Sequence, residues 1–290
     1  PFSAGVYNSI SVVTSQYQAL FLKIFGCGNF WWRFSSVVLI APMGVLLYCW
    51  LAYWFSVRSA LWASLLFYSS FYISNFSIIG YLNLTGTAHF LLLNVLLSHY
   101  VFLSRASWRF SAILGIVAGL SFYVYGGVIF PVWLLPYLLI LRKNVLKTND
   151  GRLKLLAVLF FAFLTCLPGV LSPGYLAEIL HYGVSQEHQL GLAGRLNNVL
   201  RALTVGFYNP HASHFVYGAY LDIVSSGLCI IGFCVVVKRC FATNSLERDA
   251  STLLVFMYVL VAVTLGVTSI YHHFPITRGH FLLPLLFAFS

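Results

Sequence analysis

Charged side chains are scarce in this chain of 290 residues. Asp, Glu, Lys and Arg together make up 8% of it, whereas 60% of the residues are hydrophobic. A soluble domain carries about 25% charged residues, because its surface faces water. A disordered chain combines low hydrophobicity with high net charge, so that class is excluded as well. The composition therefore predicts a polytopic membrane protein.

Acids are the rarest charged residues, six against sixteen Lys and Arg, and none precedes Asp150. The net charge of +10 does not form a continuous basic patch, so we interpret the excess as membrane topology and expect no nucleic-acid partner. Diagnostic cysteine spacing is also lacking. The six Cys form no C-x-x-C pair and mostly lie in apolar runs, which is typical of buried thiols.

Neither end of the chain has the features of a complete membrane protein. The N-terminus has no Met and no basic segment before an apolar core, so a signal peptide is not indicated. The C-terminal apolar run 281–289 is shorter than the ~20 residues of a spanning helix. We therefore expect a fragment that is cut at both ends.

Long apolar runs without strand-like alternation predict an all-α fold, a transmembrane helical bundle. The run 110–141 contains Gly126-Gly127 and then Pro131, and we interpret it as two short helices that turn at the glycines. About eight spans plus a truncated one are expected, in a single domain over 1–290. They are 36–57, 59–76, 83–103, 110–124, 127–141, 153–171, 219–237, 251–269 and the cut segment from 279.

The basic residues divide unequally between the two sides of this bundle, which predicts its orientation. Eleven would lie on one side and five on the other, so the first side is predicted to be cytoplasmic. The five outer ones are Lys23, Arg33, Arg195, Arg201 and Arg278.

Two outer segments are expected, 1–35 and 172–218. Residues 9–25 have apolar side chains at helical spacing and predict an amphipathic helix in the membrane interface. The second segment is longer than a helix connection needs, and 195–205 within it could form another interfacial helix.

The order of these elements resembles a known family. "QYQALFLKIFG" (16–26) and "NFWWRFSS" (29–36) lead into a span, and "FSVRSALWASLLFYSSFYISNFS" (55–77) adds a short basic turn. "RASWRFSAILGIVAGLSFYVYGGVIF" (105–130) follows, and "TRGHFLLPLLFAF" (277–289) closes the chain. This resembles the GT-C superfamily of membrane glycosyltransferases, in the branch of protein mannosyltransferases and aminoarabinose transferases.

The resemblance implies transfer of a sugar from a polyprenyl-phosphate donor to a glycan, lipid or protein acceptor on the outer side of the membrane. It places the catalytic acid in the first outer loop, so we expect that acid upstream of Pro1. No cofactor is expected. A bacterial inner membrane is favoured over the endoplasmic reticulum.

An inverting sugar transfer needs a carboxylate for the acceptor proton and cations for the leaving phosphate. The outer-side carboxylates are Glu178, Glu187 and Asp222, with ordinary loop acids or a helix-start residue as the alternative readings. Arg278 precedes the last helix, where the family carries an arginine. A guanidinium there can hold a lipid-linked phosphate, with ordinary interfacial anchoring as the alternative for Arg278. Arg195 and Arg201 are further candidates for contact with the phosphate or the acceptor.

Histidines supply the remaining candidates for substrate contact, His280 and His89. His89 lies in a polar stripe with Asn83, Thr85, Thr87 and Asn94, which would line a cavity or form helix-to-helix hydrogen bonds. The histidine spacing completes no diagnostic ligand set, so no metal site is predicted. Two other functions stay open: a transporter or flippase-like protein, and a catalytically inactive relative of the family.

Overall fold

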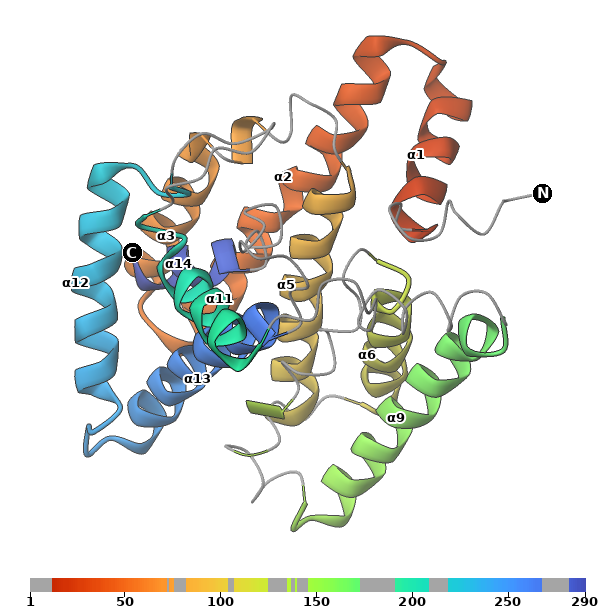
Figure 1. The fold of residues 1–290 in the computed structure, drawn as a ribbon. Helices are drawn as coiled ribbons and strands as arrows, with labels where there is room; N and C mark the ends of the chain where they lie inside the picture. Colours follow the sequence, from red (N-terminus) through yellow and green to blue (C-terminus); the bar gives the residue numbers. More distant parts are fainter. Residues whose placement is uncertain are drawn as a thin grey trace.

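The computed structural model describes residues 12–71, 73–75, 82–103, 107–124, 135–136, 139, 146–172, 191–208, 219–267 and 282–290, and the regular structure in these ranges is helical (Figure 1). The helices are α1 (Val12–Phe25), α2 (Asn29–Trp54), α3 (Val57–Ser69), α5 (Leu82–Leu103), α6 (Trp108–Ser121), α9 (Asn149–Val170), α11 (Leu192–Thr204), α12 (Ile223–Arg239), α13 (Ser245–Val267) and α14 (Leu283–Phe289).

Three of the described helices are long and apolar enough to cross a membrane. They are α2, α9 and the part Glu247–Val267 of α13, and two shorter apolar helices are Ala88–Phe102 and Trp108–Ser121. The all-α prediction is confirmed for the described residues, and the apolar helices indicate an integral membrane protein. The number of eight spans stays a prediction, because the expected span 127–141 falls largely outside the described residues.

Helix boundaries follow the apolar runs closely in one place and depart from them in another. Helix α5 covers the expected 83–103 with one extra residue, Leu82. Helix α2 begins at Asn29, seven residues before the expected start at 36. The residues between are mostly aromatic and include no helix breaker, so the helix continues to Gly28. The preceding Gly26 has φ +108°, a conformation that favours glycine and reverses the chain.

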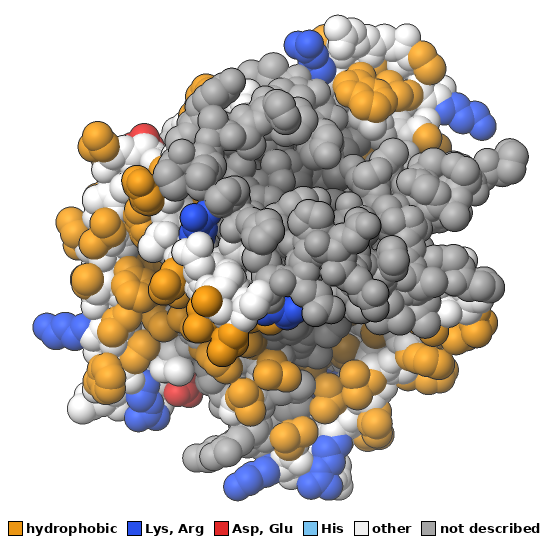
Figure 2. Space-filling view, in the orientation of Figure 1, with side chains coloured by type: hydrophobic (Ala, Val, Ile, Leu, Met, Phe, Trp, Pro, Cys, Tyr) orange, Lys and Arg blue, Asp and Glu red, His pale blue; other side chains and the backbone are white. Residues whose placement is uncertain are grey.

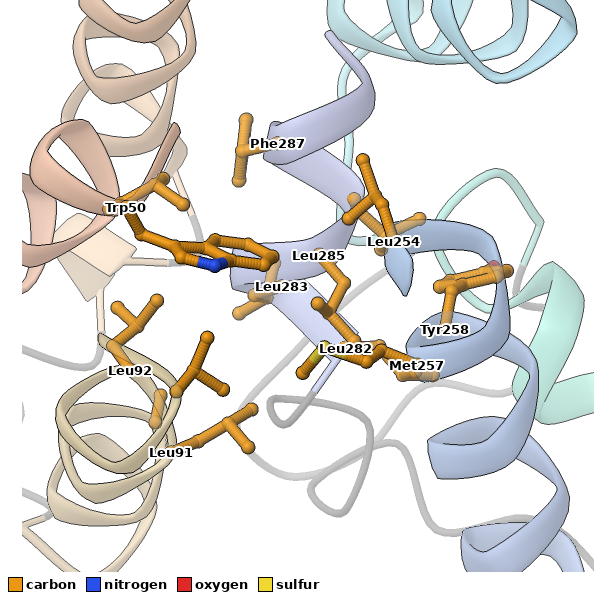
Figure 3. Close-up of a cluster of buried hydrophobic side chains, with 14 of the residues drawn as sticks. Trp50, Leu91, Leu92, Leu254, Met257, Tyr258, Leu282, Leu283, Leu285 and Phe287 are labelled. Carbon is orange, nitrogen blue, oxygen red and sulfur yellow. The ribbon is translucent and has the colours of Figure 1, made fainter. Parts of the chain in front are cut away.

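The hydrophobic core gathers around α14, the segment expected to be a truncated span. Figure 3 shows Trp50 of α2 and Leu91 and Leu92 of α5 on one side, with Met257 of α13 on the other. Leu283 and further residues of α14 lie between them. Six of the seven residues of α14 are buried. This short C-terminal helix therefore joins parts of the bundle that are distant in sequence.

Helices α6 and α9 pack closely because glycines remove side chains from their contact. A Cβ added at Gly115 would lie 2.6 Å from the carbonyl oxygen of Val158, and one at Gly119 would lie 2.6 Å from Cβ of Thr165. The two glycines are four residues apart, the small-residue spacing that lets helix backbones approach each other in membranes. The thiol of Cys166 then reaches the carbonyl of Gly119 at 3.5 Å.

The hydroxyl of Tyr123, which follows α6, bonds to the backbone of α9 next to a proline. Pro168 lies inside α9 and has no N–H to donate. The hydroxyl of Tyr123 accepts from the Gly169 N–H at 2.8 Å and reaches the carbonyl of Thr165 at 3.0 Å. A regular α-helix would join that N–H and that carbonyl directly, so the hydroxyl is inserted into the helical hydrogen-bond ladder.

A second tyrosine is placed in the same way against α2. Pro42 lies inside α2, and the hydroxyl of Tyr68 on α3 accepts from the N–H of Gly44 at 3.1 Å. The same hydroxyl donates to the carbonyl of Ala41. A Cβ at Gly44 would meet the Tyr68 ring at 2.2 Å, so only glycine admits the tyrosine here.

Candidate functional site

Helix α11, in the predicted outer segment, packs antiparallel along the last turns of α13 (Figure 1). The Tyr258 hydroxyl donates to the carbonyl of Leu203 at 2.6 Å. Arg195 Nη1 donates to the carbonyl of Val267, the last residue of α13, at 3.5 Å. The guanidinium of Arg195 therefore lies at the level where an apolar helix of spanning length ends.

Helix α11 exposes a row of leucines, whereas its buried face includes a polar side chain. Leu192, Leu196 and Leu200 are 76%, 56% and 62% exposed, and their spacing of four residues places them in one row. The face toward the protein instead buries Asn198 and Ala202. We call Leu192, Leu196 and Leu200 the leucine row. It points away from the rest of the protein, as on a helix that contacts lipid.

Arg195 lies one turn from Leu192, so a cation flanks the leucine row. In Figure 2, hydrophobic and basic side chains lie together at the surface around α11. Arg201, two turns further along, is half-buried. A helix over 192–204 thus lies where an interfacial helix over 195–205 was expected, and its place in the membrane interface stays a prediction.

The end of α11 is tied to the start of α12 by backbone hydrogen bonds. The N–H of Leu221 donates to the carbonyl of Gly206 at 3.0 Å, and the N–H of Tyr220 donates to that of Val205 at 3.4 Å. These bonds bring the helical turn of Arg201 close to Asp222. The junction therefore lies five residues after Arg201 and directly before Asp222.

Asp222 itself is the N-cap of α12. Its Oδ1 accepts from the N–H groups of Val224 and Ser225, both at 2.9 Å, and its Oδ2 accepts from the Ser225 hydroxyl at 2.7 Å. These hydrogen bonds, that of the Ser225 hydroxyl above all, lower the pKa of Asp222. A carboxylate with a lowered pKa is a poor general base, so the geometry favours the capping role over a catalytic one.

Among the described polar side chains of α5, Asn94 bonds to a neighbouring helix. Asn94 is fully buried and donates to the Ser121 hydroxyl of α6 at 2.6 Å and to the carbonyl of Phe90 at 2.8 Å. His89 is half-buried next to the backbone of Leu39. For Asn94, the interpretation as interhelical hydrogen bonding is the one the geometry favours.

Several predicted site residues lie outside the described residues, namely Glu178, Glu187, Arg278 and His280, together with the side chains of Asn83, Thr85 and Thr87. Within the described ranges, no group of three His, Cys, Asp or Glu could hold a metal ion.

The ion pairs of the described residues lie far from α11, on the predicted cytoplasmic side. Lys154 pairs with Asp150 at 2.8 Å, and Arg239 pairs with Glu247 at 2.9 Å. Arg248 contacts Asp249 at 3.7 Å. The acids in the first turns of α9 and α13 thus neutralise neighbouring cations at the predicted cytoplasmic side.

Sequence reasoning identified the arginines of α11 but missed the leucine row beside them. The signal was present, since leucines recur every four residues from 192 to 200. The sequence does not show that these leucines are exposed, because this depends on which face of α11 packs against α13. Gly266 lies in that contact. A Cβ at Gly266 would lie 2.5 Å from the backbone of Val199, so the two helices touch through their backbones.

Neither a scan against protein-family models nor searches of curated proteins and of solved structures gave a match. The chemistry of the site is therefore inferred from its own residues.

Proposed function

We propose that this chain is the membrane domain of a glycosyltransferase that moves a sugar from a polyprenyl-phosphate donor to an acceptor on the outer face of a membrane. The observation that carries the proposal is the pairing, on α11, of the exposed leucine row with the Arg195 guanidinium at the end of α13. A polyprenyl-phosphate sugar has the same two parts, a long apolar tail and a charged phosphate.

Three arginines contact the substrates in this proposal. Arg195 binds the donor phosphate while the polyprenyl tail lies along the leucine row, because a guanidinium pairs with phosphate oxygens through two hydrogen bonds. Arg201 contacts the sugar or the acceptor at the junction with α12. Arg278, outside the described residues, adds a third cation that stabilises the phosphate as it leaves.

The acceptor proton requires a carboxylate that is not engaged elsewhere. Asp222 caps α12 with both of its oxygens, so it is the weakest of the three acids for this role. Glu178 or Glu187 would take the proton.

The test is binding of undecaprenyl phosphate, which carries the tail and the phosphate without any particular sugar. The chain is reconstituted in neutral-lipid nanodiscs, and bound lipid is counted by native mass spectrometry. Arg195→Gln and Arg278→Gln should each weaken binding about tenfold or more, because a charge-assisted hydrogen bond contributes about 1.5–3 kcal/mol. Arg248→Gln, at the opposite end, is the matched control. Unchanged binding in both outer variants would overturn the phosphate role.

The proposal also requires α11 to face the outside. Two native cysteines report on sidedness, the exposed Cys27 between α1 and α2 and the half-buried Cys240 between α12 and α13. Single-cysteine variants are treated in intact cells with a membrane-impermeant maleimide. Cys27 should react from the outside, and Cys240 should react only after lysis. The reverse pattern would place the leucine row on the wrong side for this function.

A transporter or flippase-like function is the second candidate, favoured by the proline breaks inside α2 and α9. Broken helices at membrane depth form substrate sites in many transporters. The two functions differ in their product. Proteoliposomes with a labelled lipid-linked sugar would show a new glycosylated acceptor for a transferase, and only relocation of intact donor for a transporter.

A further inference from the structure

Helices α1 and α2 form an antiparallel hairpin. The Tyr17 hydroxyl donates to the carbonyl of Ser35 at 3.0 Å, and Gln18 Nε2 donates to the Ser35 hydroxyl at 3.2 Å. The chain reverses at 26–28. We call residues 20–34 the hairpin tip. Its rings pack together, with Phe21 and Phe25 4.6 Å apart and Phe25 and Trp31 stacked at 5.2 Å.

Helix α2 is longer than a hydrocarbon layer is thick. Helix α2 has 26 residues, which at 1.5 Å per residue is about 39 Å, against about 30 Å of hydrocarbon. About six residues of an upright α2 would thus lie beyond the hydrocarbon, which fits the aromatic residues at its start. Phe30 and Trp32 are exposed there, and Ile24 is exposed on α1. Aromatic side chains of this kind prefer the membrane interface.

The charge of the hairpin tip has one sign only. Lys23 and Arg33 are both exposed, and no acid occurs in the sequence before Asp150. In Figure 2, basic side chains flank hydrophobic ones at the top of the molecule, over the turn between α1 and α2. The ion pairs described above lie elsewhere, at the first turns of α9 and α13.

We propose that the hairpin tip docks into the headgroup layer of the outer leaflet and selects anionic phospholipids over zwitterionic ones. Lys23 and Arg33 contact the lipid phosphates while the aromatic rings lie at the level of the glycerol backbone. This selection is independent of sugar transfer and involves neither α11 nor its arginines.

Charge complementarity favours lipid over a second copy of the chain as the occupant. Two hairpin tips related by twofold symmetry would bring four cations together without an acid, and like charges repel. An anionic leaflet instead attracts each cation, by about 1 kcal/mol in general, which corresponds to about a fivefold change in affinity.

The experiment uses Cys27, which is exposed inside the hairpin tip, as a local reporter. A variant with Cys27 as its only cysteine is labelled with a fluorophore and reconstituted in nanodiscs without polyprenyl phosphate. Quenching is compared between spin-labelled phosphatidylglycerol and spin-labelled phosphatidylcholine at equal mole fraction. The anionic lipid should quench several-fold more strongly, and high salt should reduce the difference.

Lys23→Gln with Arg33→Gln should remove the preference, about fivefold for each charge. Lys23→Arg with Arg33→Lys should keep it, since charge and not shape is required. Arg58→Gln with Lys238→Gln, at the opposite end, should leave the local signal unchanged. Equal quenching by the two lipids in the parent chain overturns the proposal. So does protection of the fluorophore from both lipids, which would indicate a protein partner, and so does a preference that survives in the double glutamine variant.

Discussion

Helices α2 and α9 are both interrupted by a proline, and in both a neighbouring helix supplies a tyrosine hydroxyl to the interrupted backbone. They differ in where the break lies. Pro42 is 13 residues after Asn29 and 12 before Trp54, in the middle of α2, whereas Pro168 is two residues before the end of α9. The first break is thus well inside the predicted bilayer, and the second is near its outer boundary.

This difference in depth decides how much each hydroxyl contributes. In hydrocarbon, an unpaired backbone group has no water to bond with, so it is expensive. Near the boundary, water replaces a lost partner at little cost. The same side-chain chemistry should therefore stabilise α2 more than α9, although the contacts look alike.

The largest effect is expected for alanine at the glycines that admit the tyrosines. In Gly44→Ala the new Cβ meets the Tyr68 ring at 2.2 Å, and in Gly169→Ala it meets that of Tyr123 at 2.7 Å. Overpacking costs about 1–3 kcal/mol, so we expect about 3 for Gly44 and about 1 for Gly169. Unfolding free energies in bicelles would measure both. Equal losses of unfolding free energy in the two variants would show that the depth of the proline does not matter.

Removing the hydroxyls alone should give the same order with smaller values. Tyr68→Phe should cost about 1.7 kcal/mol, the upper range for hydrogen bonds between membrane helices, and Tyr123→Phe about 0.6, their average. The rings stay in place, so packing is a built-in control. A larger loss in Tyr123→Phe than in Tyr68→Phe would mean that depth does not decide the contribution.

Asp222 also bonds to backbone groups that would otherwise lack a partner, but these are N–H groups in the first turn of its own helix, α12. Asp222→Ala should cost about 1 kcal/mol, whereas Asp222→Asn should retain the cap. Because the pKa of Asp222 is lowered in the folded chain, its stabilising effect is present above the ordinary carboxyl pKa and is lost as pH falls toward the lowered one. Hydrogen exchange of Val224 and Ser225 should show this pH dependence in the parent chain and not in Asp222→Asn.

The smallest effect tests the link between proline and tyrosine in α9. Pro168→Ala removes the ring that displaces the neighbouring backbone, so the Gly169 N–H can bond the Thr165 carbonyl directly and Tyr123→Phe should then cost nothing, a coupling of about 0.6 kcal/mol. A double-mutant cycle over the two positions measures this term. Additive losses would show that Tyr123 stabilises α9 independently of Pro168.

The sequence predicted long apolar elements better than it predicted their roles. Helix α5 was expected to within one residue, because a long apolar run has no alternative to a helix in lipid. The start of α2 was misplaced, since Arg33 lowers the local hydropathy without ending a helix. Tyr68 and Tyr123 gave no signal, because their hydroxyls matter only when the partner helix arrives at the right register.

By itself, the sequence determined that the chain suits a lipid environment and that its elements are helices. It also predicted which basic residues lie at each end of the bundle. Apolar content and scarce acids decide these locally, residue by residue. Only the tertiary structure decided that the C-terminal apolar run lies at the centre of the core and that Arg195, beside the leucine row, lies at the end of α13. Each of these depends on which helices approach closely enough to touch, and glycines such as Gly266 control that approach across long separations in the chain.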